Sequence, residues 1–98
     1  MNQLRELRIA RYAVARTVRA MNRIDEAYRL MKQVCDEAAV IDEQDGYFDE
    51  EMAEILFALG RSEEARLHFV RAYKLLSRDA WMVEHEAGRL ERLRNNGA

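Results

Sequence analysis

The feature that most constrains the fold is a segment that occurs twice, 38 residues apart, at residues 23–31 and 61–69. Each copy begins with an arginine, continues with an acidic pair and an alanine, and has a large apolar residue four positions after that alanine. Acidic side chains in a first turn, followed by apolar residues at this spacing, are typical of the start of an amphipathic helix. A repeat of this period predicts helical hairpins stacked on one another.

Composition supports an all-α fold. The 98 residues contain no proline and only four glycines, and alanine, leucine, arginine and glutamate dominate. These residues favour helix almost everywhere. A chain of this length forms one domain with a modest core, so we predict a single all-α domain over residues 1–98.

Hydropathy and cysteine content indicate the compartment. Cys35 is the single cysteine and has no intramolecular disulfide partner. Residues 4–18 are interrupted by arginines and do not form the apolar core of a signal peptide. Because no apolar run of about 18 residues occurs, the sequence predicts no membrane span, and we expect a cytoplasmic protein.

Periodicity predicts five helices. The first two form a hairpin over about residues 3–41, the next two a hairpin over about 48–76, and a capping helix covers about 80–94. Asn22 and Gly60 suit the left-handed conformation that ends a helix. We expect Ser62 to cap the fourth helix, and Ser77 or Asp79 the fifth.

The predicted core consists of apolar residues that recur on one face of each helix. In chain order these residues are Leu7, Ala10, Val14, Val18, Met21, Ala27, Leu30, Met31, Val34, Ala38, Met52, Ile55, Leu56, Leu59, Ala65, Phe69, Ala72, Leu75, Leu76, Val83, Ala87, Leu90 and Leu93. Arginines of the first helix, among them Arg5, Arg8, Arg16 and Arg19, are expected on the face opposite this core. His68 is expected to be a solvated residue on the outer side of the fourth helix.

Residues 59–65, which read LGRSEEA, resemble the middle of a tetratricopeptide repeat when followed by Phe69 and Ala72. The resemblance implies that Gly60 ends one helix, that Ala65 lets two helices approach, and that Phe69 fills the space between hairpins. The chain then holds about two repeats and a C-terminal capping helix. An ordinary helical bundle with one similar turn is the alternative.

Several positions depart from the family pattern. Ser77 stands where a proline is usual, and the spacing is 38 rather than about 34 residues. The first-helix aromatic pattern has no counterpart among residues 49–56. In the earlier copy, the positions of Gly60, Phe69 and Ala72 hold Asn22, Met31 and Val34.

The resemblance implies a concave face that binds an extended or helical peptide of a partner protein. The partner-binding residues predicted on it are Ile9, Tyr12, Arg16, Arg19, Tyr47, Glu50, Glu54, Phe57, Trp81 and Glu84, with Glu91 beside them. Tyr12, Phe57 and Trp81 are the expected anchors, because aromatic residues carry much of the binding energy at interfaces. In the alternative interpretation, Arg16 and Arg19 pair with Glu50 and Glu54, and the aromatic residues belong to the core.

No pattern indicates catalysis. Cys35, His68 and His85 lie on separate helices without metal-ligand spacing. The acidic segment 42–46 lacks the calcium ligands of an EF-hand, because aligning Gly46 with the required glycine places Ile41 at the first ligand position. We therefore predict no catalytic, cofactor-binding or metal-binding residues and no enzymatic activity.

Charge separates the remaining hypotheses. Residues 1–23 carry a net charge of +5, residues 24–64 of −10 and residues 65–98 of +3. We favour an adaptor or chaperone-like subunit that binds a protein or peptide. The main alternative is a homo-oligomer, such as a homodimer, whose groove is filled by its own copy. Nucleic-acid binding through the arginines of the first helix is opposed by the acidic middle segment, which repels a polyanion.

Overall fold

The computed structural model describes residues 2–98, and the side chains of residues 4–98. The helices in this range, in chain order, are α1 (Asn2–Ala20), α2 (Ile24–Val40), α3 (Gly46–Ala58), α4 (Ser62–Leu76), α5 (Ala80–His85) and α6 (Ala87–Asn96). The described residues contain no strand, so the predicted all-α fold is confirmed.

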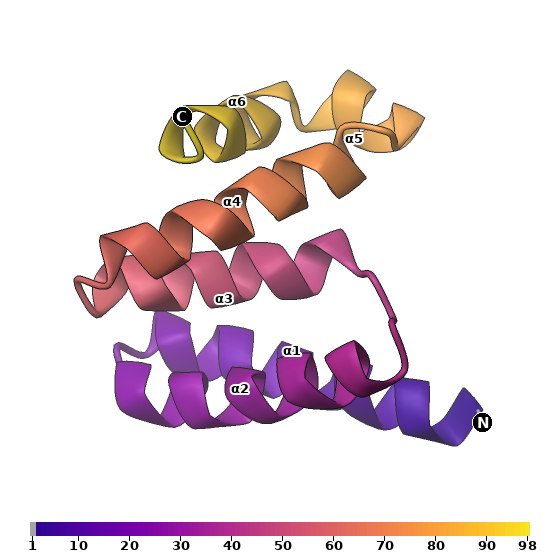
Figure 1. Cartoon of the computed structure of the whole chain (residues 1–98), viewed down its shortest axis with the longest axis vertical. Helices are drawn as coiled ribbons and strands as arrows, with labels where there is room; N and C mark the ends of the chain where they lie inside the picture. Colours follow the sequence, from indigo (N-terminus) through magenta and orange to yellow (C-terminus); the bar gives the residue numbers. More distant parts are fainter. Residues whose placement is uncertain (1) are drawn as a thin grey trace.

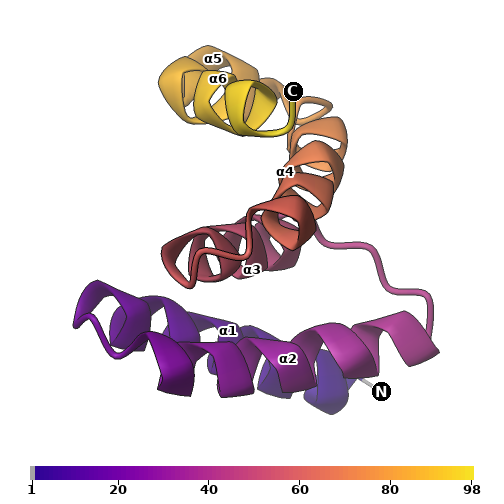
Figure 2. The same cartoon turned by 60° about the vertical axis from the view of Figure 1, so that its left-hand side comes forward.

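The helices form three layers stacked along the longest axis of the molecule (Figure 1). The antiparallel pair α1 and α2 forms one end, α3 and α4 form the middle, and α5 and α6 lie over α4 at the other end. Figure 2 shows that, among the described residues, no element lies on the side of α1 and α2 that faces away from α3. The two ends of the stack are therefore covered differently.

The turns inside the two hairpins have the same geometry. Asn22 and Gly60 both have positive φ, 64° and 77°. In each turn the next residue donates its N–H to a carbonyl five positions earlier, from Arg23 to Val18 (3.1 Å) and from Arg61 to Leu56 (2.9 Å). These are the hydrogen bonds of a Schellman motif. The predicted helix-ending roles of Asn22 and Gly60 are confirmed.

The starts of α2 and α4 are equally alike. Arg23 and Arg61 occupy the N-cap with φ/ψ of −96°/69° and −92°/67°, without a side-chain capping bond. Each guanidinium instead pairs with the acidic residue three positions on, as Arg61 does with Glu64 at 2.8 Å. The prediction that Ser62 caps α4 is wrong, because Ser62 is the first helical residue.

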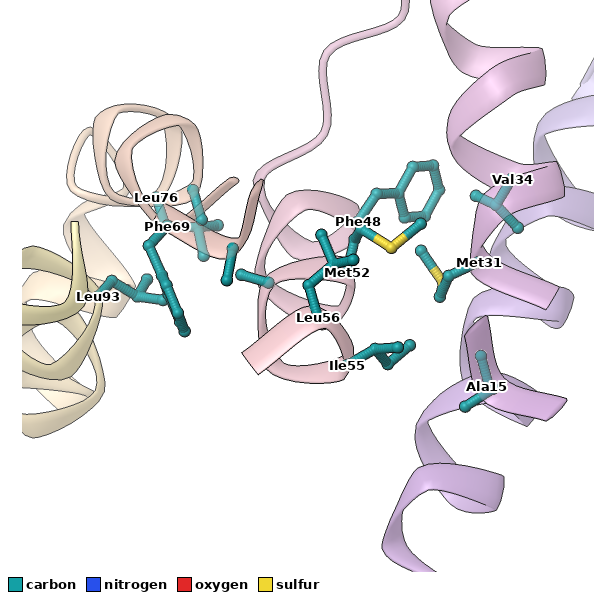
Figure 3. Close-up of a cluster of buried hydrophobic side chains, with 14 of the residues drawn as sticks. Ala15, Met31, Val34, Phe48, Met52, Ile55, Leu56, Phe69, Leu76 and Leu93 are labelled. Atoms are coloured by element: carbon teal, nitrogen blue, oxygen red, sulfur yellow. The ribbon is translucent and has the colours of Figure 1, made fainter. Parts of the chain in front are cut away.

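Equivalent positions in α2 and α4 are buried. They are Ala27 and Ala65, Met31 and Phe69, Val34 and Ala72, and Ala38 and Leu76. Figure 3 shows the layer that α3 forms between these helices: Phe48, Met52 and Ile55 point toward Met31 and Val34, while Phe69 lies beside Leu93 on the other side. The core thus runs through the whole stack. These residues confirm the predicted core, except for Phe48, which is buried but was not predicted.

The predicted core face of the first helix is wrong except at Val18, which is buried as predicted. Leu7, Val14 and Met21 are 46%, 50% and 58% exposed, whereas Arg8 and Ala15 are buried. The helix faces α2 and α3 with the side that carries Arg8, Ala15 and Val18, and the Arg8 guanidinium binds the Glu43 carboxylate (Nε to Oε1, 2.8 Å) in the connection after α2. The apolar stripe therefore faces outward.

The predicted capping helix is also wrong in detail, because it breaks at Glu86 (φ −132°, ψ 40°) into α5 and α6. Asp79 caps α5 by accepting the N–H of Trp81 at 2.9 Å, as predicted. The break turns Met82, Leu90 and Leu93 inward and leaves Val83 and Ala87 exposed. Gly88 in the first turn of α6 lowers the cost of interrupting the helix here.

Candidate functional site

The face formed by α1, α3 and α6 carries a set of charged residues that follows the repeat. Arg16, Glu54 and Arg92 are spaced by 38 residues and lie on α1, α3 and α6. Ion pairs join α3 to α1 and to α6 across this face. We call it the concave face and describe its pairs from α1 to α6.

Arg19 on α1 binds Glu51 on α3 through both carboxylate oxygens, with Nη2 3.1 Å from Oε1. Glu51 is only 3% exposed, so its charge needs this partner. The hydrogen bond to Glu51 raises the pKa of Arg19 above its usual value, which keeps the guanidinium charged. This pair locks α1 against α3.

Two arginines of α6 bind the carboxylates that were predicted from the sequence to line the partner-binding face. Arg89 binds Glu50, with Nε 2.7 Å from Oε2, and Arg92 binds Glu54 through two contacts of 2.8 Å. These hydrogen bonds raise the pKa values of both arginines. Glu50 and Glu54 are thus bound by α6, and the alternative pairing with Arg16 and Arg19 is wrong.

Two tyrosines of the predicted face pack partly into the molecule. The Tyr12 ring lies 5.7 Å from that of Phe48, and burial raises the pKa of the Tyr12 hydroxyl. The Tyr47 ring lies below the Arg89 guanidinium, at 5.4 Å. Both rings therefore support the arrangement of the charged residues and offer only part of their surface to a ligand.

Two other aromatic residues remain accessible. Phe57 is 51% exposed, meets the Phe69 ring edge-on at 6.3 Å and has the Arg92 guanidinium above it at 5.9 Å. Trp81, 53% exposed, lies on α5, and its ring packs in a tilted arrangement against the His85 ring, with the ring centroids 5.2 Å apart. Phe57 is thus an apolar surface held in place from both sides.

The structure brings together part of the predicted site. Tyr12, Arg19, Tyr47, Glu50, Glu54 and Phe57 join through the contacts above. Ile9 and Arg16 are exposed on α1, Trp81 and Glu84 lie on α5, and Glu91 is exposed on α6. The sequence analysis missed Glu51, Arg89 and Arg92. Arg92 could have been predicted, because it lies 38 residues after Glu54 and so continues the spacing of the repeat.

Most arginines of α1 face carboxylates of the same chain. Arg5 and Arg8 share Glu43, and Arg11 binds Glu37 at 3.0 Å. The hydrogen bond from Arg8 holds the pKa of Glu43 below its usual range, so this carboxylate stays charged at neutral pH. Internal pairing weakens the attraction of these arginines for nucleic-acid phosphate.

Apart from this face, a hollow with a volume of about 300 Å³ lies between α2 and α4. Cys35, Phe48 and His68 line it, and His68 Nδ1 lies 2.8 Å from Asp49 Oδ1. The expectation that His68 is simply solvated is therefore wrong. Burial raises the pKa of Cys35 to about 12, so its thiol stays protonated and poorly nucleophilic at neutral pH.

Comparisons with known proteins do not assign the chain to a family. No protein-family model, curated protein or solved structure matches it. Among the described residues, no group of three or more His, Cys, Asp or Glu side chains is arranged to hold a metal ion. None of the helices in residues 2–98 is long and apolar enough to cross a membrane. Function must be argued from the surface geometry.

Proposed function

We propose that the protein is a small tetratricopeptide-like binding module, an adaptor or chaperone-like subunit, that holds a peptide or helix of a partner protein on its concave face. The observation that carries the proposal is Phe57. A half-exposed aromatic ring, held between Phe69 and Arg92, offers a partner an apolar contact whose position is already fixed. Aromatic residues fixed in this way supply binding energy at little cost in conformational entropy.

The ion pairs of this face suggest the chemistry of the ligand. Glu50, Glu51 and Glu54 are each neutralised by an arginine, so the face does not present free carboxylates in the middle. Arg16 is exposed on α1, and no ion pair joins it to the described residues. This arrangement favours a peptide that places an apolar side chain on Phe57 and an acidic group toward Arg16.

The experiment is affinity capture followed by mass spectrometry, comparing the wild-type chain with the double variant Phe57→Ala, Arg16→Glu. Both side chains are exposed, so helicity measured by circular dichroism should be unchanged. Arg19 is left intact because it neutralises the buried Glu51. We expect the double variant to lose the partners that the wild type captures.

The matched control is Leu67→Ala, which removes an equally exposed apolar residue from α4, away from this face. It should capture the wild-type set of partners. Equal capture by the double variant and the wild type would contradict the assignment of the concave face.

A further inference from the structure

The 38-residue repeat identifies a docking surface that nothing in the described chain covers. α3 docks on the first hairpin through Phe48, Met52 and Ile55, which are buried. The residues 38 positions after Met52 and Ile55 are Leu90 and Leu93 of α6, and both are buried in the stack. The residues 38 positions before these three are Ala10, Val14 and Thr17 of α1, and all of them are exposed.

We call the outward row of α1 residues the α1 stripe; it consists of Leu7, Ala10, Val14, Thr17 and Met21. Their spacing alternates between three and four residues, which is the spacing of a seam between two packed helices. The Thr17 hydroxyl already donates to the Ala13 carbonyl at 3.0 Å, so it needs no polar partner across an interface. Arg11, beside the stripe, is held by Glu37. The α1 stripe is thus a continuous apolar seam without an unpaired charge in it.

The opposite end of the stack cannot receive this seam. The exposed residues of α6 include Glu91, Arg94 and Asn95, which are charged or polar. The exposed apolar residues at this end, Trp81 and Val83, lie on α5, whose 6 residues are too short to match the full length of the α1 stripe. Head-to-tail stacking of copies would bury these groups against apolar side chains at a high cost in desolvation. The surface of the chain that matches the α1 stripe is the α1 stripe of another copy.

We propose that a second copy of the chain covers the α1 stripe through a two-fold interface in which the two α1 helices run antiparallel. With Val14 at the two-fold axis, Leu7 lies opposite Met21 of the second copy, and the small residues Ala10 and Thr17 let the helices approach closely. Large side chains then meet large ones at both ends of the seam.

Charges at the ends of α1 select the antiparallel direction. Glu6 lies at one end of the seam and Arg23 at the other, and both are exposed. In an antiparallel pair each Glu6 approaches Arg23 of the second copy, whose exposed guanidinium also pairs with Glu26 of its own chain. A parallel pair instead sets like charges against each other. The helix dipoles favour the same direction. The concave face stays open, since Arg16 and Tyr12 lie on another side of α1 from the stripe.

The first test is the mass of the whole chain by sedimentation equilibrium over a concentration series. We expect twice the 11.5 kDa chain mass for the wild type at the upper concentrations. Val14→Glu sets two carboxylates opposite each other at the axis, so this variant should stay at 11.5 kDa, with unchanged circular dichroism because Val14 is exposed in the single chain. Leu67→Glu, an equally exposed change on α4, should keep the dimer. A monomeric wild type, or a dimer that survives Val14→Glu, would overturn the proposal.

The second test is disulfide cross-linking in a Cys35→Ala background, which removes the native thiol. Val14→Cys should cross-link to itself, because the two Val14 positions meet at the axis. Leu7→Cys should cross-link only when mixed with Met21→Cys. Self-cross-linking of Leu7→Cys, whether or not Val14→Cys also cross-links, would overturn the antiparallel arrangement.

Discussion

The two hairpins share their turns and their buried positions but differ in how they are covered. The second hairpin packs on the first through α3 and under α6 through α4, so it is enclosed on both sides. The first hairpin is covered on one side only within the described chain. The difference lies in a few side chains: where α3 has Phe48, Met52 and Ile55, α1 has Ala10, Val14 and Thr17. A repeat thus fixes the local structure, while these substitutions decide what docks on it.

The largest expected effect comes from the residue that fills each hairpin. Phe69→Ala should lower the free energy of unfolding by about 4 kcal/mol and Met31→Ala by about 3 kcal/mol, because each leaves a cavity in the core. Urea unfolding followed by circular dichroism measures both. A much smaller loss for Met31→Ala, below that of an ordinary surface change, would mean that the two hairpins do not share one packing scheme.

Glu51 of α3 forms an ion pair with Arg19 of the first hairpin, whereas the equivalent position in α1 carries no charge. Glu51→Gln should lower the free energy of unfolding by about 2 kcal/mol, because it leaves the partly buried Arg19 without a carboxylate. We expect a smaller loss than for a fully buried pair, because Arg19 remains partly exposed to solvent. The equivalent position in α1 is Ala13, which is exposed, so Ala13→Gln should change stability by less than about 0.5 kcal/mol. Equal effects in thermal unfolding would show that the pair contributes nothing specific.

The start of α3 is more tightly packed than the start of α6. A Cβ at Gly46 would lie 2.7 Å from Leu76 Cγ and 3.1 Å from Leu75 Cβ, so Gly46→Ala should cost about 2 kcal/mol through overpacking. Gly88→Ala on α6 is the control, because its Cβ meets open space and should stabilise the helix by about 0.5 kcal/mol. Chemical denaturation measures the free energy of unfolding of both variants. An unchanged stability of Gly46→Ala would show that Leu76 can move to make room for the added Cβ.

The smallest expected effect comes from a substitution in the turn of the second hairpin. Gly60→Ala should cost about 1 kcal/mol, because alanine resists the left-handed conformation at φ 77°. Gly60→Asn should cost less, since Asn22 adopts the same conformation in the first turn. Melting temperatures rank the two variants, and the reverse ranking would contradict the equivalence of the turns.

Local patterns predicted much of this fold. The left-handed residues Asn22 and Gly60 and the buried stripes of α2 and α4 follow from nearest neighbours along one helix, so they could be predicted from the sequence. The core face of α1 could not, because both sides of that helix carry apolar residues. The buried side meets partners far away in the sequence, such as Glu43, which binds Arg8, and these partners do not appear in the pattern of one helix.

The candidate site shows the same limit. Residues on α1 and α3 were predicted from the resemblance, but the ion pairs of Glu50 and Glu54 depend on α6, which begins after the break at Glu86. Single-helix periodicity contains no information on such a break. The arginines Arg89 and Arg92 were therefore missed, although the spacing from Glu54 to Arg92 repeats the period of the chain.

Hydrogen exchange at increasing protein concentration tests most directly the central claim that α1 offers a repeat-equivalent docking surface to a second copy. Amides in residues 7–21 should exchange more slowly as concentration rises, while those of α6 stay unchanged. The Val14→Glu variant should show no such dependence. Exchange of α1 that is independent of concentration in the wild type, or slowing that is uniform over all helices, would contradict the account.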